Sequence, residues 1–342
     1  MELKVVFAGC GGIGEAWLKI VAEHPEWKLR LVGFVDVRLD AAQRYAEQYG
    51  VPGAAFGVDL DAILTQMQPD IVFDCTIPEA HHPITLTALA HGCHVLGEKP
   101  LADSLEHARE MIAAAERAGK LYGVMQNRRF DPNLLRLKRL IHSGEIGAIT
   151  TLHSDFFNAP HFVGFRHTMR HPLIFDMAIH TFDAARYLLN ADPVAVYCHE
   201  WNPSGSSFAH GASAVAVFEM TDGIVYTYRG SWAAEGVMTA WEAEWRVLGE
   251  CGSATWNGAE SYRAQKISAT GGFFNEFAEI DLPPLAAMPA VHHAGGIADF
   301  IHAVRTGGKP LNPGAENIKS LAMVFAAIES AETGQRVPIL VG

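Results

Sequence analysis

The sequence predicts an α/β protein of two domains, with a doubly wound parallel sheet in residues 1–123 and an α+β domain in residues 124–342. Short apolar runs alternate with amphipathic helical segments over about the first 120 residues, which indicates crossover connections and a parallel sheet. A glycine-rich turn joins the first apolar run to the first helix. Beyond residue 123, long strand-like stretches follow one another across short turns, which favours a large, mainly antiparallel sheet.

The first domain is built from four expected buried strands and four expected helices. The strands are predicted at residues 3–8, 29–35, 71–76 and 94–96. The helices are predicted at residues 15–23, 41–49, 60–67 and 84–91. Helical sequence separates each strand from the next, so neighbouring strands are expected to run parallel.

The second domain begins with helices and continues with strands. Helices are expected at residues 132–142 and 173–189, and strands at 212–219, 224–232, 243–248 and 252–256. The turn residues Thr221, Asp222 and Gly223 predict a hairpin between the first two of these strands. Two amphipathic helices, at 295–306 and 316–333, are expected to close the chain and to pack back on the first domain.

Composition excludes several classes of protein. The formal net charge of -12 disfavours binding to nucleic acid and to anionic membrane surfaces. No run approaches the roughly 18 apolar residues of a membrane span, and the first residues lack the features of a secretory signal. The five cysteines form no C-x-x-C pair, which argues against disulfides and a thiolate zinc site. We therefore expect a cytoplasmic protein.

A dinucleotide-binding fingerprint follows the first expected strand. Gly9-x-Gly11-x-x-Gly14 permits a tight turn and a close approach of the backbone to a pyrophosphate at the next helix N-terminus. Asp36 ends the second strand, where a carboxylate binds the adenosine ribose hydroxyls. That carboxylate would repel the 2′-phosphate of NADP, although Arg38 could weaken the repulsion. We therefore expect NAD as the cofactor, with NADP less favoured.

Lys99 follows the strand at residues 94–96, at the carboxyl edge of the sheet where doubly wound folds bind ligands. An ammonium group at that place can hydrogen-bond a substrate hydroxyl and stabilise negative charge that develops on oxygen. From spacing alone, a solvated loop lysine is an equal alternative.

Asp176 and His180 are four residues apart on an expected helix and should share one of its faces. A carboxylate beside an imidazole orients the ring and raises its basicity, as general-base catalysis requires. Taken alone, the two residues are more typical of an ordinary pair on a helix surface than of a catalytic pair.

Three motifs in order give the chain a specific resemblance to the Gfo/Idh/MocA oxidoreductases, the family of glucose–fructose oxidoreductase and inositol dehydrogenase. They are GCGGIG at 9–14, EKP at 98–100 and D-x-x-x-H at 176–180. The segments PEAHH (78–82), NRRFDP (127–132) and SGEIG (143–147), together with residues 299–334, also resemble the family. The likeness thus extends nearly from end to end.

The resemblance implies a Rossmann domain followed by a domain with an open antiparallel sheet, one face of which packs against a second subunit. It implies that Lys99 polarises the reacting C–O group, that His180 moves its proton and that Asp176 positions both. Hydride then passes directly between substrate carbon and nicotinamide, without a metal. We expect a homo-oligomer, a dimer or a tetramer, that acts on a sugar, a sugar acid or a cyclitol.

The fingerprint and the resemblance together define the candidate site. The cofactor-binding candidates are Gly9, Gly11, Gly12, Ile13, Gly14, Asp36, Arg38, Thr76, Pro78, His82, Glu98 and Lys99. The catalytic candidates are Lys99, Asp176 and His180. The substrate-binding candidates are Lys99, Asn127, Arg166, Asp176 and His180.

One segment departs from the family pattern. Arg170, His171 and Pro172 stand where related chains commonly carry a glycine run, which predicts a bulkier and more cationic pocket. Arg166, His167 and His171 could bind an acidic sugar, or they could be surface or ion-paired residues. The i,i+4 spacing of the two histidines admits a metal pair, but no acidic or thiolate companion accompanies it, and we expect no metal.

Two other functions remain compatible with these motifs. A non-catalytic, NAD-binding regulator would keep the fold, although such a protein has no need of Lys99, Asp176 and His180. A redox-neutral, NAD-dependent glycosidase would recycle the hydride internally and form product without net change in NADH. Steady-state turnover distinguishes the first alternative from a dehydrogenase, and NADH absorbance distinguishes the second.

Overall fold

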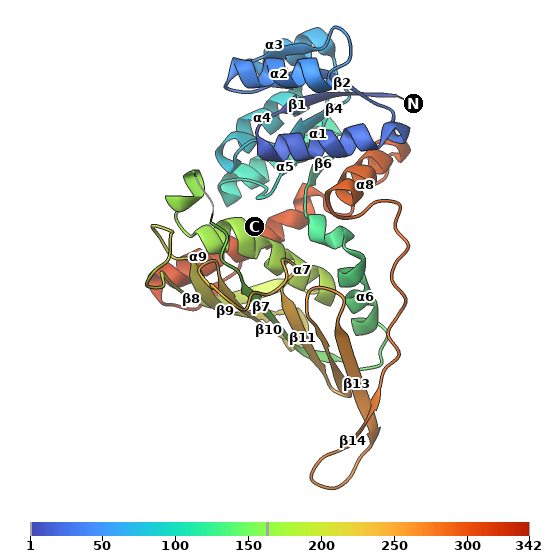
Figure 1. Cartoon of the computed structure of the whole chain (residues 1–342), viewed down its shortest axis with the longest axis vertical. Coiled ribbons are helices and arrows are strands. Elements are labelled where there is room, and N and C mark those ends of the chain that lie inside the picture. Colours follow the sequence, from blue (N-terminus) through green and yellow to red (C-terminus); the bar gives the residue numbers. More distant parts are fainter. Residues whose placement is uncertain (1, 162–163, 342) are drawn as a thin grey trace. The chain divides into compact units, whose positions relative to one another are not determined.

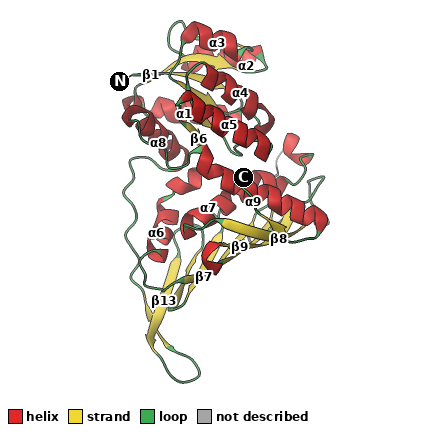
Figure 2. Cartoon of the chain, turned by 180° about the vertical axis from the view of Figure 1, so that it is seen from behind, coloured by secondary structure: helices red, strands yellow, loops and turns green. Residues whose placement is uncertain are grey.

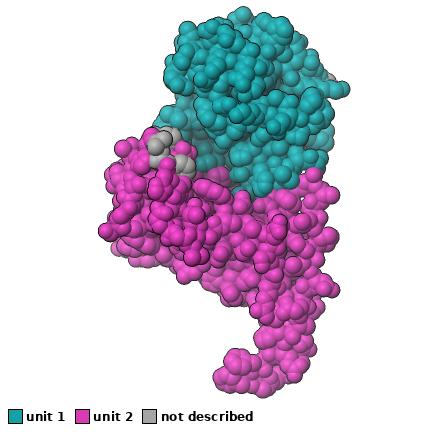
Figure 3. Space-filling view, viewed as in Figure 1, with its two compact units in different colours: residues 1–130, 289–318 teal, residues 131–288, 319–342 magenta. Residues whose placement is uncertain are grey.

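The computed structural model describes residues 2–161 and 164–341 (Figure 1). The chain divides into two compact units, which Figure 3 distinguishes by colour. Unit 1 comprises Met1–Phe130 and Pro289–Ile318, and unit 2 comprises Asp131–Met288 and Lys319–Gly342. Among the described residues, no helix combines the length and apolar character required to cross a bilayer.

Unit 1 contains a six-stranded sheet in the order β3-β2-β1-β4-β5-β6, in which every neighbouring pair is parallel. The strands are β1 (Leu3–Ala8), β2 (Leu29–Val35), β3 (Ala55–Gly57), β4 (Ile71–Asp74), β5 (His94–Gly97) and β6 (Tyr122–Val124). The chain leaves β1 toward β2 and β3 and returns on the other side to β4. The predicted doubly wound parallel sheet is thereby confirmed.

Helices connect these strands and pack on both faces of the sheet (Figure 2). They are α1 (Gly12–Glu23), α2 (Leu39–Tyr49), α3 (Leu60–Met67), α4 (Pro78–Ala90) and α5 (Leu105–Ala118). A later helix, α8 (His292–Thr306), also belongs to unit 1 and packs against α1 and β5. With helices on both faces the central strands β1, β4 and β5 are mostly buried, which explains their continuous apolar sequences, whereas β3 at the edge is partly exposed.

Aromatic side chains fix α1 to the central strands. Phe7 of β1 meets Phe73 of β4 edge to face at 5.3 Å between ring centroids, and Trp17 of α1 contacts the same Phe73 at 5.4 Å. All three side chains belong to one buried cluster that also includes Phe300 of α8. This packing holds the first residues of α1 at the carboxyl end of β1.

Unit 2 contains a nine-stranded sheet in the order β14-β13-β12-β11-β7-β10-β9-β8-β15. The strands are β7 (Ile149–Phe157), β8 (Pro193–Trp201), β9 (Ser213–Met220), β10 (Val225–Ser231), β11 (Glu244–Gly249), β12 (Gly252–Trp256), β13 (Tyr262–Ala269), β14 (Glu276–Glu279) and β15 (Val337–Pro338). Only β7 and β10 pair in parallel, and the other neighbours are antiparallel. The expected large, mainly antiparallel sheet is confirmed, as is the hairpin at residues 221–223.

The helices of unit 2 cover one face of this sheet. They are α6 (Pro132–Ile141), α7 (Ile179–Leu189) and the part of α9 (Gly314–Thr333) that follows residue 318. Phe182 of α7 packs edge to face on Phe218 of β9 and on Tyr226 and Tyr228 of β10. Strands β8 and β9 alternate buried and exposed residues, so their other face is open in this chain.

One expected helix is divided by a change of helical type. The sequence predicts a single α-helix at residues 173–189, but the structure has a π-helical turn at Leu173–Ala178 before α7 begins at Ile179. Asp176 lies in the π-helical turn and His180 lies in α7. A π-helical turn is uncommon, and such turns occur frequently at functional sites.

Candidate active site

The turn between β1 and α1 has four glycines: at two of them a side chain would collide with backbone, and at the other two it would enter open space. Gly9 has φ of +91°, and a Cβ there would lie 2.6 Å from the Cys75 carbonyl carbon and oxygen. A Cβ on Gly14 would lie 2.2 Å from the carbonyl oxygen of Gly9. Gly11 and Gly12, in contrast, have no heavy atom within 4 Å of such a Cβ. The turn therefore leaves open space beside the free N–H groups of α1, as a bound pyrophosphate requires.

Asp36 is fixed beside this turn. Its Oδ2 accepts a hydrogen bond from the backbone N–H of Cys10 at 2.7 Å, and its Oδ1 accepts one from the N–H of Arg38 at 2.9 Å. The Asp36 side chain is 12% exposed, whereas that of Arg38 is 62% exposed with its Nε 3.8 Å from Oδ1. The carboxylate is thus oriented before a ligand binds, and the guanidinium reaches it only loosely.

A buried ion pair, which was not predicted from the sequence, joins the last residue of β4 to α4. His81 Nδ1 lies 2.9 Å from Oδ2 of Asp74, and Oδ1 of Asp74 accepts from the hydroxyl (2.5 Å) and the N–H (3.1 Å) of Thr76. Burial opposes charge on both partners, but their mutual attraction prevails. It lowers the pKa of Asp74 and raises the pKa of His81. The Thr76 hydroxyl is directed at Asp74, and the Thr76 backbone nitrogen lies beside Gly9.

Pro78 and His82 lie in the first turns of α4. Pro78 is the first residue of the helix. His82 Nε2 lies 2.6 Å from Glu110 of α5, and its ring stacks on His107 at 4.0 Å between centroids. Of the two adjacent histidines, His81 is the buried one. The cofactor contact expected for His82 stays a prediction.

Glu98 and Lys99 follow directly after β5, at the same carboxyl edge of the sheet. Trp17 Nε1 donates to Oε1 of Glu98 at 2.8 Å, while Oε2 accepts from the N–H of Lys99 at 3.1 Å. His293 of α8 lies 3.9 Å from the same Oε1, and burial lowers its pKa although Glu98 opposes that shift. Glu98 is buried and Lys99 is half-buried. The backbone that carries Lys99 is therefore held in place by α1.

In unit 2, the Asp176 carboxylate forms an ion pair with Arg166. Arg166 Nε donates to Oδ2 of Asp176 at 2.6 Å, and the two side chains are 31% and 11% exposed. His180 is half-buried on the following helix. The expected regular α-helix is interrupted here, because Asp176 lies in the π-helical turn and His180 in α7. That the two side chains share one helix face stays a prediction. The structure adds a guanidinium to the predicted pair.

The segment expected to make the pocket more cationic is paired with carboxylates. His171 Nδ1 lies 2.5 Å from Glu200, and its Nε2 lies 3.3 Å from Glu332, which also binds Arg170 at 3.1 Å. The hydrogen bond with Glu200 raises the pKa of His171. His167 Nδ1 contacts the carbonyl oxygen of Ser207 at 3.0 Å. Arg166 and His171 are thus ion-paired in this structure, and the binding of an acidic sugar by these residues stays a prediction.

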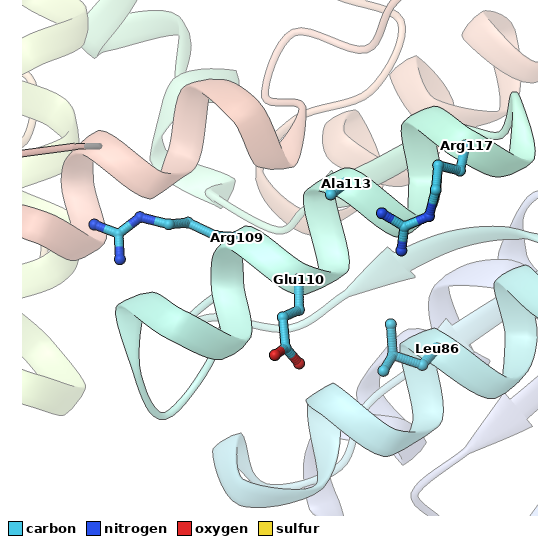
Figure 4. A pocket seen from close by; sticks show the side chains of 5 residues that line it. All are labelled: Leu86, Arg109, Glu110, Ala113 and Arg117. Atoms are coloured by element: carbon cyan, nitrogen blue, oxygen red, sulfur yellow. The ribbon is translucent and has the colours of Figure 1, made fainter.

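A separate cavity of about 460 Å³ lies between α4 and α5 (Figure 4). Leu86 on α4 and Arg109, Glu110, Ala113 and Arg117 on α5 line it. None of these residues is a catalytic or cofactor candidate.

Comparison with known proteins assigns both parts of the chain. Residues 3–126 match the model of an oxidoreductase family with an NAD-binding Rossmann fold, and residues 134–255 match the GFO/IDH/MocA C-terminal domain. The chain belongs to the Gfo/Idh/MocA oxidoreductase family. Unit 1 is accordingly an NAD-binding Rossmann domain, and the chain is an enzyme of the dehydrogenase and reductase class.

Relatives in this family are similar over nearly the whole length. The chain is 28% identical to 1,5-anhydro-D-fructose reductase from Ensifer adhaerens, over 91% of this chain and 92% of that protein. It is 26% identical to inositol 2-dehydrogenase from Rhizobium meliloti, over 99% and 100%. An oxidoreductase from Agrobacterium radiobacter, solved with NAD⁺, L-tartaric acid and magnesium, has the same fold with a TM-score of 0.81. That structure is 23% identical and covers 99% of each chain.

Proposed function

We propose that this enzyme transfers a hydride between NAD and a CH–OH group of a sugar, a sugar acid or a cyclitol. The observation that carries the proposal is the arrangement at one edge of the unit 1 sheet. There, open space at Gly11 and Gly12 adjoins the fixed carboxylate of Asp36, and Lys99 follows β5 at the same edge. Unit 1, which adds residues 124–130 and 289–318 to the predicted residues 1–123, would act as the cofactor domain, and unit 2 as the substrate domain.

The cofactor set proposed from the sequence fits this edge. The N–H groups of α1 and the space at Gly11 and Gly12 would receive the pyrophosphate, with Ile13, which is 38% exposed, beside them. Asp36 would accept from the adenosine ribose hydroxyls with its remaining lone pairs. The backbone of Thr76 and Pro78 would support the other half of the dinucleotide. When bound, NAD supplies the hydride acceptor or donor.

The chain's own residues would manage the substrate oxygen and its proton. In alcohol oxidation, Lys99 would hydrogen-bond the hydroxyl and stabilise the negative charge that develops as the proton leaves. His180 would take that proton as general base, and Asp176, charged and held by Arg166, would position the imidazole. Asn127 and Arg166 would contribute contacts to the rest of the substrate.

Asp36 is expected to enforce the preference for NAD over NADP. Replacing it by Ser removes the acceptor for the ribose hydroxyls and the charge that repels a 2′-phosphate, so NADH binding should weaken by about tenfold while NADPH binding improves. Arg38, already adjacent, would then be available to the phosphate. Fluorescence titration of both reduced cofactors measures the change. Tighter binding of NADPH than of NADH by the unmodified protein would show that Asp36 has no such role.

We also propose that the open face of the unit 2 sheet pairs with a second copy of the chain, giving a dimer or a tetramer. Its exposed apolar residues are Val194, Tyr197 and Trp201 on β8, Val215 and Val217 on β9, and Val225 on β10. Tyr197 and Val217 are direct cross-strand neighbours. Apolar side chains exposed on three neighbouring strands are costly in water, and association removes that cost.

Sedimentation at micromolar concentration is expected to give a multiple of the 37.2 kDa chain mass. Val217→Lys, which places a charge in the middle of this face, should shift the mass toward that of one chain. Val58→Lys is the matched control, because Val58 is 60% exposed but lies in unit 1. A single-chain mass for the unmodified protein would contradict the proposed pairing.

The test of the function itself is turnover. NAD-loaded protein is mixed with a panel of polyols, sugars, sugar acids and cyclitols, and NADH absorbance is followed. At least one alcohol should reduce the cofactor. Product formation without net NADH would instead support a redox-neutral enzyme.

A further inference from the structure

Gln126 presents a buried carboxamide without partners at the cofactor edge of unit 1. Its side chain is 1% exposed, and neither Nε2 nor Oε1 has a hydrogen-bond partner among the described residues. Leaving both the donor and the acceptor of one amide unpaired is costly, and native proteins satisfy nearly all such groups. A ligand group or an ordered water that pairs with these atoms is therefore expected in the working protein.

The place of Gln126 in the chain indicates which part of the cofactor lies nearest to it. It lies two residues after β6, and the N–H of Met125 donates to the carbonyl of Gly97 at 2.8 Å, so the chain here runs beside the start of Glu98 and Lys99. Strand β6 is three places from β1, or about 14 Å at the usual strand spacing, on the side away from β2. Because Asp36 after β2 marks the adenosine half, β5 and β6 lie under the nicotinamide half.

We propose that the Gln126 side chain recognises the nicotinamide carboxamide through a pair of hydrogen bonds. A primary carboxamide has one carbonyl acceptor and one NH₂ donor, so it complements the glutamine amide atom for atom. Nε2 donates to the nicotinamide carbonyl oxygen, and Oε1 accepts from the nicotinamide NH₂. The pair fixes the rotation of the ring and hence the face that it offers to the substrate. This inference rests on the proposed binding of NAD.

The structure offers a matched control for this residue. Asn317 of α9 is also fully buried in unit 1, with both of its amide atoms unpartnered among the described residues. It lies within a helix and not at the carboxyl end of a strand. Asn317→Leu therefore removes a comparable buried amide, and it is expected to leave the recognition of nicotinamide unchanged.

The test compares three ligands by fluorescence titration: NADH, ADP-ribose, which lacks the nicotinamide, and the reduced acetylpyridine analogue, in which a methyl ketone replaces the carboxamide. Gln126→Leu should weaken NADH about tenfold and leave ADP-ribose unchanged. The unmodified protein should prefer NADH to the ketone analogue, and Gln126→Leu should abolish that preference. Gln126→Glu, which keeps the size but loses the donor, should also weaken NADH and not ADP-ribose.

Three results would overturn the proposal. They are unchanged NADH affinity in Gln126→Leu, an equal loss of ADP-ribose, and no preference for NADH over the ketone analogue in the unmodified protein. The comparison of NADH with the ketone analogue uses the unmodified protein. Equal affinity for the two ligands would therefore contradict the proposal even if Gln126→Leu does not fold. Failure of the unmodified protein to bind either NADH or ADP-ribose would contradict the proposed function itself, which distinguishes the two cases.

Discussion

Replacing His180 by Ala is expected to slow hydride transfer by about 10²–10⁴-fold, because a positioned general base contributes that much to a step in which a proton must leave. NADH affinity should be unchanged, since the cofactor candidates belong to unit 1 and His180 belongs to unit 2. Stopped-flow measurement of NADH formation gives the rate of the step, with an alcohol found by the turnover screen as substrate.

His210→Ala provides the control for that experiment. His210 is an exposed histidine of the same unit, so its loss should alter neither the rate nor the affinity. If the His180 variant transfers hydride at the unmodified rate across neutral pH, His180 has no part in the chemistry. The surface-pair interpretation of residues 176 and 180 would then be correct.

The second large effect is expected at the glycine turn. Gly14→Ala forces a Cβ to within 2.2 Å of the Gly9 carbonyl oxygen, and because backbone must move to relieve the contact, the free energy of unfolding should fall by about 1–3 kcal/mol or more. NADH binding should also be lost, because the backbone movement that relieves the contact displaces the N-terminus of α1. Chemical denaturation and fluorescence titration measure the two effects separately.

Gly11→Ala is the matched control. Its φ of -99° suits any residue, and the added Cβ meets nothing within 4 Å, so the free energy of unfolding should stay within about 0.5 kcal/mol. NADH affinity should nevertheless fall by roughly tenfold, because the methyl occupies space that the pyrophosphate needs. Normal NADH binding by the Gly11 variant would place the pyrophosphate elsewhere.

The sequence predicted those elements in which one strong local signal dominates. The strands at residues 3–8 and 29–35 and the helix at 60–67 have the predicted bounds, because continuous apolar runs and a clear helical period define them. Strand β7 was not predicted, since it carries Thr151, His153 and Asp155 on its less buried side. Its identity as a strand depends on its neighbours β10 and β11, which lie far away in sequence.

In the candidate site, likewise, the sequence predicts the parts that a local motif marks and not those that depend on contacts between distant residues. Motif spacing locates the glycine turn, but adjacent histidines at 81 and 82 give no local sign of which one is buried beside Asp74. Trp17 holds Glu98 across 81 residues of sequence, and no periodicity signals such a contact. The π-helical turn was equally hidden, because i,i+4 spacing of Asp176 and His180 is compatible with an ordinary helix.

The central claim is that a bound dinucleotide is reduced by a substrate alcohol. Its most direct test is the absorbance of NADH after the NAD-loaded protein is mixed with the polyol and sugar panel, with the His180→Ala variant measured in parallel. The account predicts that NADH forms with at least one alcohol and forms far more slowly in the variant. A protein that binds NAD but leaves it oxidised with every sugar, sugar acid and cyclitol of the panel would contradict it.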